Sequence, residues 1–123
     1  MIWLAVAAGG SFGALARFGI AQWMSGFGLK WPLATFSANI LGSFLMGLGF
    51  VIIVEKTMLP DPWRHLLLVG FLGAFTTFST FAIETLTLIE AEQWKTAIIY
   101  WLSSCLATIM VAFLGATLAR QIF

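Results

Sequence analysis

The chain has 123 residues, of which 61% are hydrophobic and only 9% are charged, and its formal net charge is +1. Its mean hydropathy of +1.01 excludes a compact soluble domain, because such a chain could not present enough polar surface to water. We therefore expect an integral membrane protein surrounded by lipid, with no nucleic acid among its partners.

Four apolar stretches follow one another and fill the chain, at about residues 2–23, 32–54, 63–89 and 97–119. Each is near or above the ~20 residues that a helix needs to cross the hydrocarbon core. The sequence therefore predicts a single all-α domain over residues 1–123, with four transmembrane helices and no room for a soluble domain.

The first span differs from a secretory signal, because it has no basic n-region and no convincing cleavage site. We expect it to be retained in the membrane. It opens a series of small residues spaced by four, which let helix backbones approach closely. The pairs are Gly9 with Gly13, Gly10 with Ala14, Ala38 with Gly42, and Ser43 with Gly47. They could serve packing within one subunit or contact between two.

The second span carries a polar stripe. Thr35, Asn39 and Ser43 are spaced by four residues and so share one face of a helix. A single hydroxyl in a membrane helix commonly bonds back to the carbonyl four residues earlier. Stripes on several helices favour a hydrogen-bonding track instead.

The third span contains an unusual run over residues 73–81, Gly-Ala-Phe-Thr-Thr-Phe-Ser-Thr-Phe. Gly70 and Gly73 weaken a helix, and the hydroxyl residues that follow compete for its backbone bonds, so we expect a break here. Carbonyls freed by a break can hold a cation. Phe78 and Phe81 would share one face, where their positive ring edges could contact a small anion. Simple packing is the alternative.

Glu84, later in the third span, is an ionisable group at membrane depth and hence a functional candidate. It could couple protons, act as a gate, or be a hydrogen-bonded carboxyl near the wet end of a pore. In the fourth span, Tyr100, Ser104 and Thr108 repeat the four-residue spacing of the second.

The loops give no clear orientation. Four spans place three basic residues on each side of the membrane, Lys56, Arg64 and Arg120 against Lys30, Lys95 and the loop-proximal Arg17. The positive-inside rule needs an excess, and three against three offers none. Insertion both ways would make an antiparallel homodimer the natural assembly. An orientation set by other context is the alternative.

Three elements together resemble a known family. They are Gly9-Gly10-x-x-Gly13-Ala14-x-x-Arg17 in span one, Thr35-x-x-x-Asn39-x-x-Gly42-Ser43 in span two, and Gly70-Phe71-x-Gly73-Ala74-Phe75-Thr76-Thr77-Phe78-Ser79-Thr80-Phe81 with Glu84 in span three. On these motifs the chain resembles the Fluc (CrcB) fluoride channels along its whole length, with span four matching less distinctively.

The resemblance implies a fluoride-selective channel in the bacterial inner membrane that exports fluoride passively and lowers its cytoplasmic concentration. It also implies an antiparallel, dual-topology homodimer with two pores lined by both subunits. Phe78 and Phe81 match the phenylalanines whose ring edges contact fluoride, and Asn39 matches the pore asparagine. The other matching pore positions are Ser79, Thr80, Thr35, Tyr100, Ser104 and Glu84. Arg17 matches an arginine near the pore vestibule, and the carbonyls of Gly73 and Thr76 match a structural sodium site at the dimer centre.

Two other functions compete. A proton-coupled small multidrug transporter is also a short four-span protein, but it needs an early membrane carboxylate, and the first span offers Arg17 and no acid. A membrane assembly factor would leave the polar residues unexplained. An enzyme is not expected, because Cys105 and His65 belong to no catalytic or metal-binding constellation, and a lone Cys105 cannot form an intramolecular disulfide.

Overall fold

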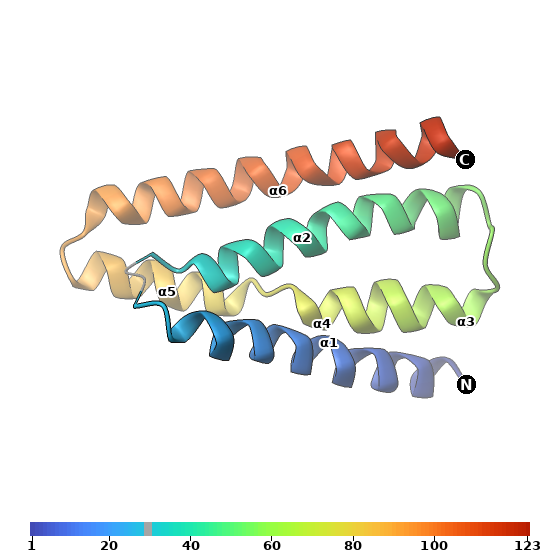
Figure 1. Ribbon diagram of the computed structural model, residues 1–123, viewed down its shortest axis with the longest axis horizontal. Helices are drawn as coiled ribbons and strands as arrows, with labels where there is room; N and C mark the ends of the chain where they lie inside the picture. Colours follow the sequence, from blue (N-terminus) through green and yellow to red (C-terminus); the bar gives the residue numbers. More distant parts are fainter. Residues whose placement is uncertain (29–30) are drawn as a thin grey trace.

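The computed structural model describes residues 1–28 and 31–123, which form a bundle of four long helical spans with no strand in those ranges (Figure 1). The spans cover Ile2–Ser25, Leu33–Glu55, Asp61–Glu90 and Trp94–Ile122, each long and apolar enough to cross a membrane. The predicted all-α architecture with four transmembrane helices is confirmed, with slightly different ends.

The spans differ in regularity. The first is the single helix α1 (Ile2–Ser25), and the fourth is α6 (Trp94–Ile122). The second is α2 (Leu33–Gly49), continued by the wider π-helix η1 (Phe50–Glu55). The third comprises α3 (Asp61–Trp63), the π-helix η2 (Arg64–Leu72), α4 (Gly73–Phe75) and, after an interruption, α5 (Ser79–Glu90). Both termini lie at one end of the bundle, together with the connection between the second and third spans (Figure 1).

The closest helix pairs are α1 with η2 and α2 with α6. A Cβ atom on Gly13 would lie 2.1 Å from the carbonyl oxygen of Phe71, and one on Gly47 would lie 2.0 Å from that of Ala112. A side chain at either glycine would therefore collide with a neighbouring backbone. Gly13 and Gly47 therefore serve packing within the subunit, which was one of the two interpretations that the sequence left open.

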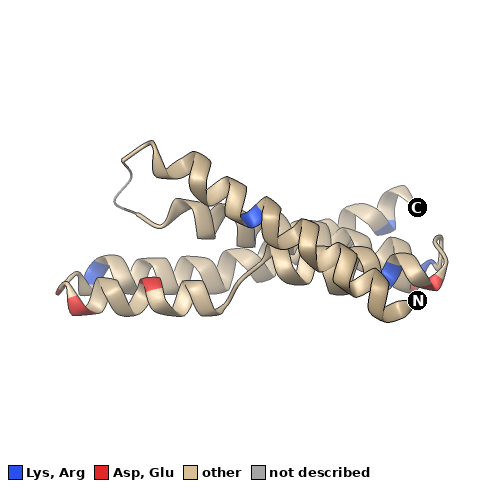
Figure 2. Ribbon diagram, turned by 90° about the horizontal axis from the view of Figure 1, so that it is seen from below, with Lys and Arg blue, Asp and Glu red and all other residues tan. Residues whose placement is uncertain are grey.

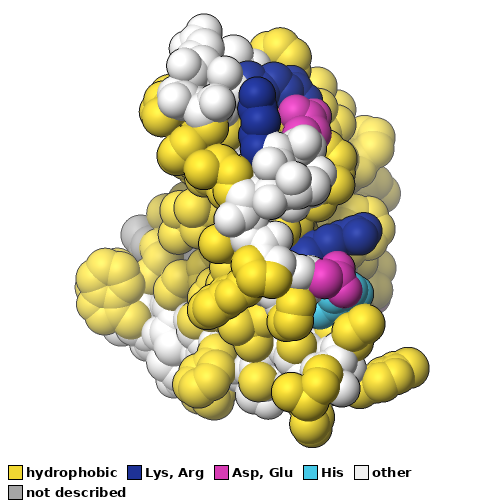
Figure 3. All heavy atoms as spheres, turned by 90° about the vertical axis from the view of Figure 1, so that its right-hand side faces the viewer, with side chains coloured by type: hydrophobic (Ala, Val, Ile, Leu, Met, Phe, Trp, Pro, Cys, Tyr) yellow, Lys and Arg dark blue, Asp and Glu magenta, His cyan; other side chains and the backbone are white. Residues whose placement is uncertain are grey.

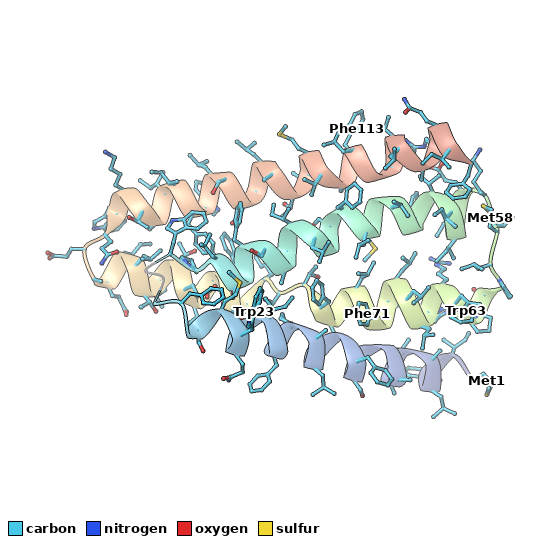
Figure 4. All side chains as sticks on the ribbon, in the orientation of Figure 1. Met1, Trp23, Met58, Trp63, Phe71 and Phe113 are labelled. Carbon is cyan, nitrogen blue, oxygen red and sulfur yellow. The ribbon has the colours of Figure 1, made fainter. Side chains whose placement is uncertain are left out.

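The outside of the bundle is largely apolar, as lipid requires. Phe113 on α6 points away from the other helices (Figure 4) and is 67% exposed. Most charged residues lie towards the two ends (Figure 2). Basic and acidic side chains lie side by side at the end that holds the termini (Figure 3), where Arg120 of α6 donates to the Glu55 carboxylate of η1.

Arg17 lies well inside α1 rather than beside a loop. The helix continues to Ser25, which is about 12 Å further along the axis at 1.5 Å per residue. Counting Arg17 as a loop-proximal charge was therefore wrong. Without it, the basic residues stand at three against two, and Lys30, one of those two, lies outside the described residues.

Candidate functional site

The third span breaks between α4 and α5. The Thr76 N–H still donates to the Leu72 carbonyl oxygen at 3.1 Å, closing the last turn of the first half. Thr76 itself then has extended dihedral angles, φ −86° and ψ 157°, and the helix resumes at Ser79. The predicted break is confirmed, and it lies within the run of glycine and hydroxyl residues.

Asn39 of α2 binds the backbone that the break exposes. Its Oδ1 atom accepts a hydrogen bond from the Thr77 N–H at 2.8 Å, and its Nδ2 atom donates to the Thr77 carbonyl oxygen at 3.0 Å. The Thr77 hydroxyl in turn accepts from the Thr80 N–H at 3.2 Å, which satisfies one free donor at the start of α5. One amide side chain thus replaces both helical partners of one residue.

Gly42 makes room for this arrangement. A Cβ atom at Gly42 would lie 2.3 Å from the Thr76 Cγ2 atom and 3.2 Å from the Phe75 ring. The absence of a side chain therefore lets α2 come directly against the break. The glycine sits one turn beyond Asn39, so the same helix face supplies both the amide and the space.

Arg17 of α1 binds the other side of the break. Its Nε atom donates to the Ala74 carbonyl oxygen at 3.1 Å, and the contact is partly buried. Ala74 belongs to α4, so its carbonyl is one of those left free where the first half of the span ends.

Two more carbonyls of the break, those of Gly73 and Thr76, accept no hydrogen bond from any residue that the structure describes. Neutral carbonyl oxygens are suitable ligands for a hard cation. Within residues 1–28 and 31–123, no group of three or more His, Cys, Asp or Glu side chains is placed to hold a metal ion. The carbonyl oxygens of Gly73 and Thr76 are thus among the free oxygen ligands that the break offers.

The two phenylalanines after the break lie close together but differ in burial. Their ring centroids are 5.6 Å apart, yet Phe81 is 5% exposed and Phe78 is 78% exposed. Phe81 packs edge-to-face against Tyr100, with centroids 5.0 Å apart. Phe78 precedes the first residue of α5 and projects from the subunit. The two rings therefore lie one at the surface of the subunit and one in its interior.

A carboxylate and two hydroxyls from three helices meet beyond Phe81. The Tyr100 hydroxyl donates to Glu84 Oε1 at 2.9 Å, and the Thr35 hydroxyl donates to Glu84 Oε2 at 3.0 Å. Tyr100 is fully buried and Thr35 is 7% exposed. Both carboxylate oxygens are thus solvated by protein hydroxyls, which reduces the cost of an acidic group at membrane depth.

The remaining predicted hydroxyl residues lie in α6 and at the start of α5. Ser104 is buried one turn from Tyr100, and its hydroxyl has no partner among the described residues. Thr108 bonds back to the Ser104 carbonyl at 2.7 Å, the common arrangement for a membrane threonine. Ser79 is exposed and Thr80 half-buried at the start of α5. The structure brings together Thr35, Tyr100 and Glu84, while Asn39 bonds to the backbone of the break.

Trp31 was missed as a site residue, because its position before the second span favours an ordinary interfacial role. Its ring packs edge-to-face against Tyr100 with centroids 5.3 Å apart, and also against Phe36 at 5.1 Å. The aromatic series therefore continues from Phe78 through Phe81 and Tyr100 to Trp31. No spacing in the sequence connects residues so far apart along the chain.

Residues 4–116 match the family described as CrcB-like protein, Camphor Resistance (CrcB). A relative from Saccharophagus degradans named fluoride-specific ion channel FluC is 48% identical over 99% of this chain and 92% of that protein. Relatives of the same name from Magnetococcus marinus and Hahella chejuensis are 44% and 42% identical, each over 95% of this chain and over 96% and 93% of their own length. On this evidence the chain belongs to the CrcB-like family.

Proposed function

We propose that this protein is a fluoride-selective ion channel that lets fluoride leave the cytoplasm down its electrochemical gradient and so lowers its internal concentration. The observation that carries the proposal is the broken third span, next to which Phe81 and the buried hydroxyls of Thr35 and Tyr100 lie in an otherwise apolar bundle. Relatives named fluoride-specific ion channels, similar over nearly their whole length, support the choice of ion.

The geometry offers a small anion a series of weak partners. Fluoride is strongly hydrated, so a pore must replace its water without binding it too tightly to release. Ring edges of Phe78 and Phe81 carry partial positive charge, and the hydroxyls of Ser79, Thr80 and Ser104 can donate hydrogen bonds. None of these groups carries a fixed positive charge, which suits an ion that must pass.

Glu84 has a consistent place in this path. An unshielded carboxylate would repel an anion, but here both oxygens accept bonds from the hydroxyls of Thr35 and Tyr100. We propose that Glu84 marks the wet end of the pore and orients these two hydroxyls. The proton-coupled multidrug transporter is not favoured, because the relatives are named channels.

One subunit leaves an aromatic ring exposed and two backbone carbonyls of the break without partners in the part of the chain that the structure describes, which supports an antiparallel homodimer. Phe78 is 78% exposed beside the break, and the carbonyls of Gly73 and Thr76 have no partner among the described residues. In a bilayer each unpaired group costs several kcal/mol. The near balance of basic residues supports insertion in both orientations, in an inner membrane, with two pores shared between the subunits.

A sodium ion is the proposed structural partner of the two free carbonyls. Gly73 and Thr76 of one subunit with the same pair from the other would supply four neutral oxygens. When bound, the ion would satisfy backbone groups that lipid cannot.

Fluoride efflux from liposomes containing the purified protein tests the function, with a fluoride electrode as readout and chloride as control. Rapid release of fluoride without chloride is expected, and a folded protein that releases neither ion would reject the channel. Orientation is tested separately by adding two lysines at the carboxyl terminus. Activity should fall and return when a copy biased the other way is co-expressed, whereas unchanged activity with uniform orientation would reject dual topology.

A further inference from the structure

Arg17 presents a problem that the proposed pore does not solve. It lies within a membrane span, where an unpaired charge costs several kcal/mol even after the side chain and water adjust. The salt bridges within the described residues join His65 to Asp61 and Arg120 to Glu55, so Arg17 is not neutralised by a carboxylate there. Its hydrogen-bond partner among the described residues is the Ala74 carbonyl oxygen, 3.1 Å from Nε.

The position of that carbonyl explains why a hydrogen-bond donor belongs there. The first half of the third span ends at α4, and the C-terminal end of a helix carries partial negative charge from its free carbonyls. A basic side chain at this end donates a hydrogen bond to a free carbonyl and also interacts favourably with the partial negative charge there. Arg17 is therefore placed as the cap of the half-helix that stops at Phe75.

The break is then held from two sides. Arg17, from α1, holds the carbonyl of the second residue before Thr76, and Asn39, from α2, holds the N–H and carbonyl of the residue after it. Both flanks of the extended Thr76 are thus fixed within one subunit. The free carbonyls of Gly73 and Thr76 lie among the residues held in this way.

We propose that Arg17 is a positioning residue for the break, acting through its Nε hydrogen bond to Ala74 rather than by attracting anions to the pore mouth. The expected effect of Arg17 on fluoride flux rests on the proposed channel function. Its expected effect on the backbone of the break rests on the hydrogen bond alone. In this role the donor matters more than the charge.

Two substitutions separate donor from charge. In Arg17→Gln, the Nε2 amide stands the same number of bonds from Cα as the arginine Nε, so the donor is kept while the charge is removed. In Arg17→Met, the side-chain length is similar but both donor and charge are lost. The experiment measures fluoride efflux from liposomes and, independently, amide hydrogen exchange over residues 73–81 in the full-length protein.

If Arg17 positions the break, Arg17→Gln keeps most of the efflux and the slow exchange of the wild type, while Arg17→Met exchanges at least tenfold faster there and loses most of its efflux. If Arg17 acts by charge, both variants lose efflux equally, their exchange stays at the wild-type rate, and the proposal is overturned. Should Arg17→Met not be recovered folded, Arg17→Gln decides alone, since a folded variant with lost efflux contradicts the proposal. A wild-type protein without efflux would reject the channel function. The comparison of amide exchange between wild type and the two variants would still test whether Arg17 positions the break.

Discussion

Replacing Asn39 tests how much the broken span depends on a single side chain. Asn39→Leu keeps a similar volume but removes both hydrogen bonds to Thr77, at 2.8 and 3.0 Å. It leaves one N–H and one carbonyl of Thr77 in a partly buried position without the side chain that bonds to them. We expect the variant to fold less stably and to conduct less fluoride.

The size of the loss follows from these two groups. A buried polar group left unpaired costs roughly 1–3 kcal/mol, whereas side-chain bonds between membrane helices average only about 0.6 kcal/mol. The lower end of the first range applies here, because the Thr77 N–H and carbonyl could partly regain hydrogen bonds by adopting helical geometry. Two such groups give about 2 kcal/mol, or roughly a thirtyfold change in the folding equilibrium.

The assay is reversible unfolding in mixed micelles, followed by tryptophan fluorescence. Ser43→Ala is the matched control, because Ser43 lies one turn beyond Asn39 on the same helix face and its side chain makes no hydrogen bond to the described residues. If Asn39→Leu loses no more stability than Ser43→Ala, the claim that the amide holds the break is refuted.

Asn39→Asp adds a dependence on pH. An ionised carboxylate can still accept from the Thr77 N–H, but its second oxygen faces the Thr77 carbonyl, which it would repel. Protonation restores a donor at that position, so the deficit in stability relative to wild type should shrink as the pH falls from 8 to 5. A deficit that is constant over this range would contradict the bonding scheme.

Three further tests probe packing and the pore. Gly13→Ala should destabilise by about 1–3 kcal/mol because of overpacking, since its methyl would lie 2.1 Å from a backbone carbonyl, while Gly19→Ala, with no atom within 4 Å, should not; equal unfolding midpoints would refute the close contact. Phe81→Ile should lower subunit stability and Phe78→Ile should not, because they are 5% and 78% exposed. Both should depress efflux, and full efflux in the double variant would reject the ring contacts. Tyr100→Phe removes the hydroxyl that donates to the third-span carboxylate but keeps the ring packing, so efflux should fall more than stability; the opposite pattern would count against a pore role.

Much of the fold was predictable because lipid restricts what a chain can do. Spans of about twenty apolar residues have few alternatives to a helix, so the four spans followed from composition alone. The break was predictable for a related reason, since Gly73 and the threonines after it weaken the helix locally. In both cases the signal lies in adjacent residues.

The contacts that complete the site were not predictable in the same way. Arg17 bonds to a backbone carbonyl 57 positions away, and no side-chain pattern reveals which carbonyl a break leaves free. The spacing of Phe78 and Phe81 predicted neighbouring rings, which lie 5.6 Å apart, but it could not show that the first ring is 78% exposed and the second 5% exposed. Such facts depend on where a helix starts in space.

The way the break is held also bears on how the protein is made. The groups that satisfy it come largely from α1 and α2. Within the third span, the Thr76 N–H and the hydroxyls of Thr76 and Thr77 contribute. If the third span were alone in a bilayer, a break would leave several of its backbone N–H and carbonyl groups without hydrogen bonds. A continuous helix would pair these groups with one another. Newly inserted chains should therefore carry an unbroken third span, which opens only as the first two spans dock against it.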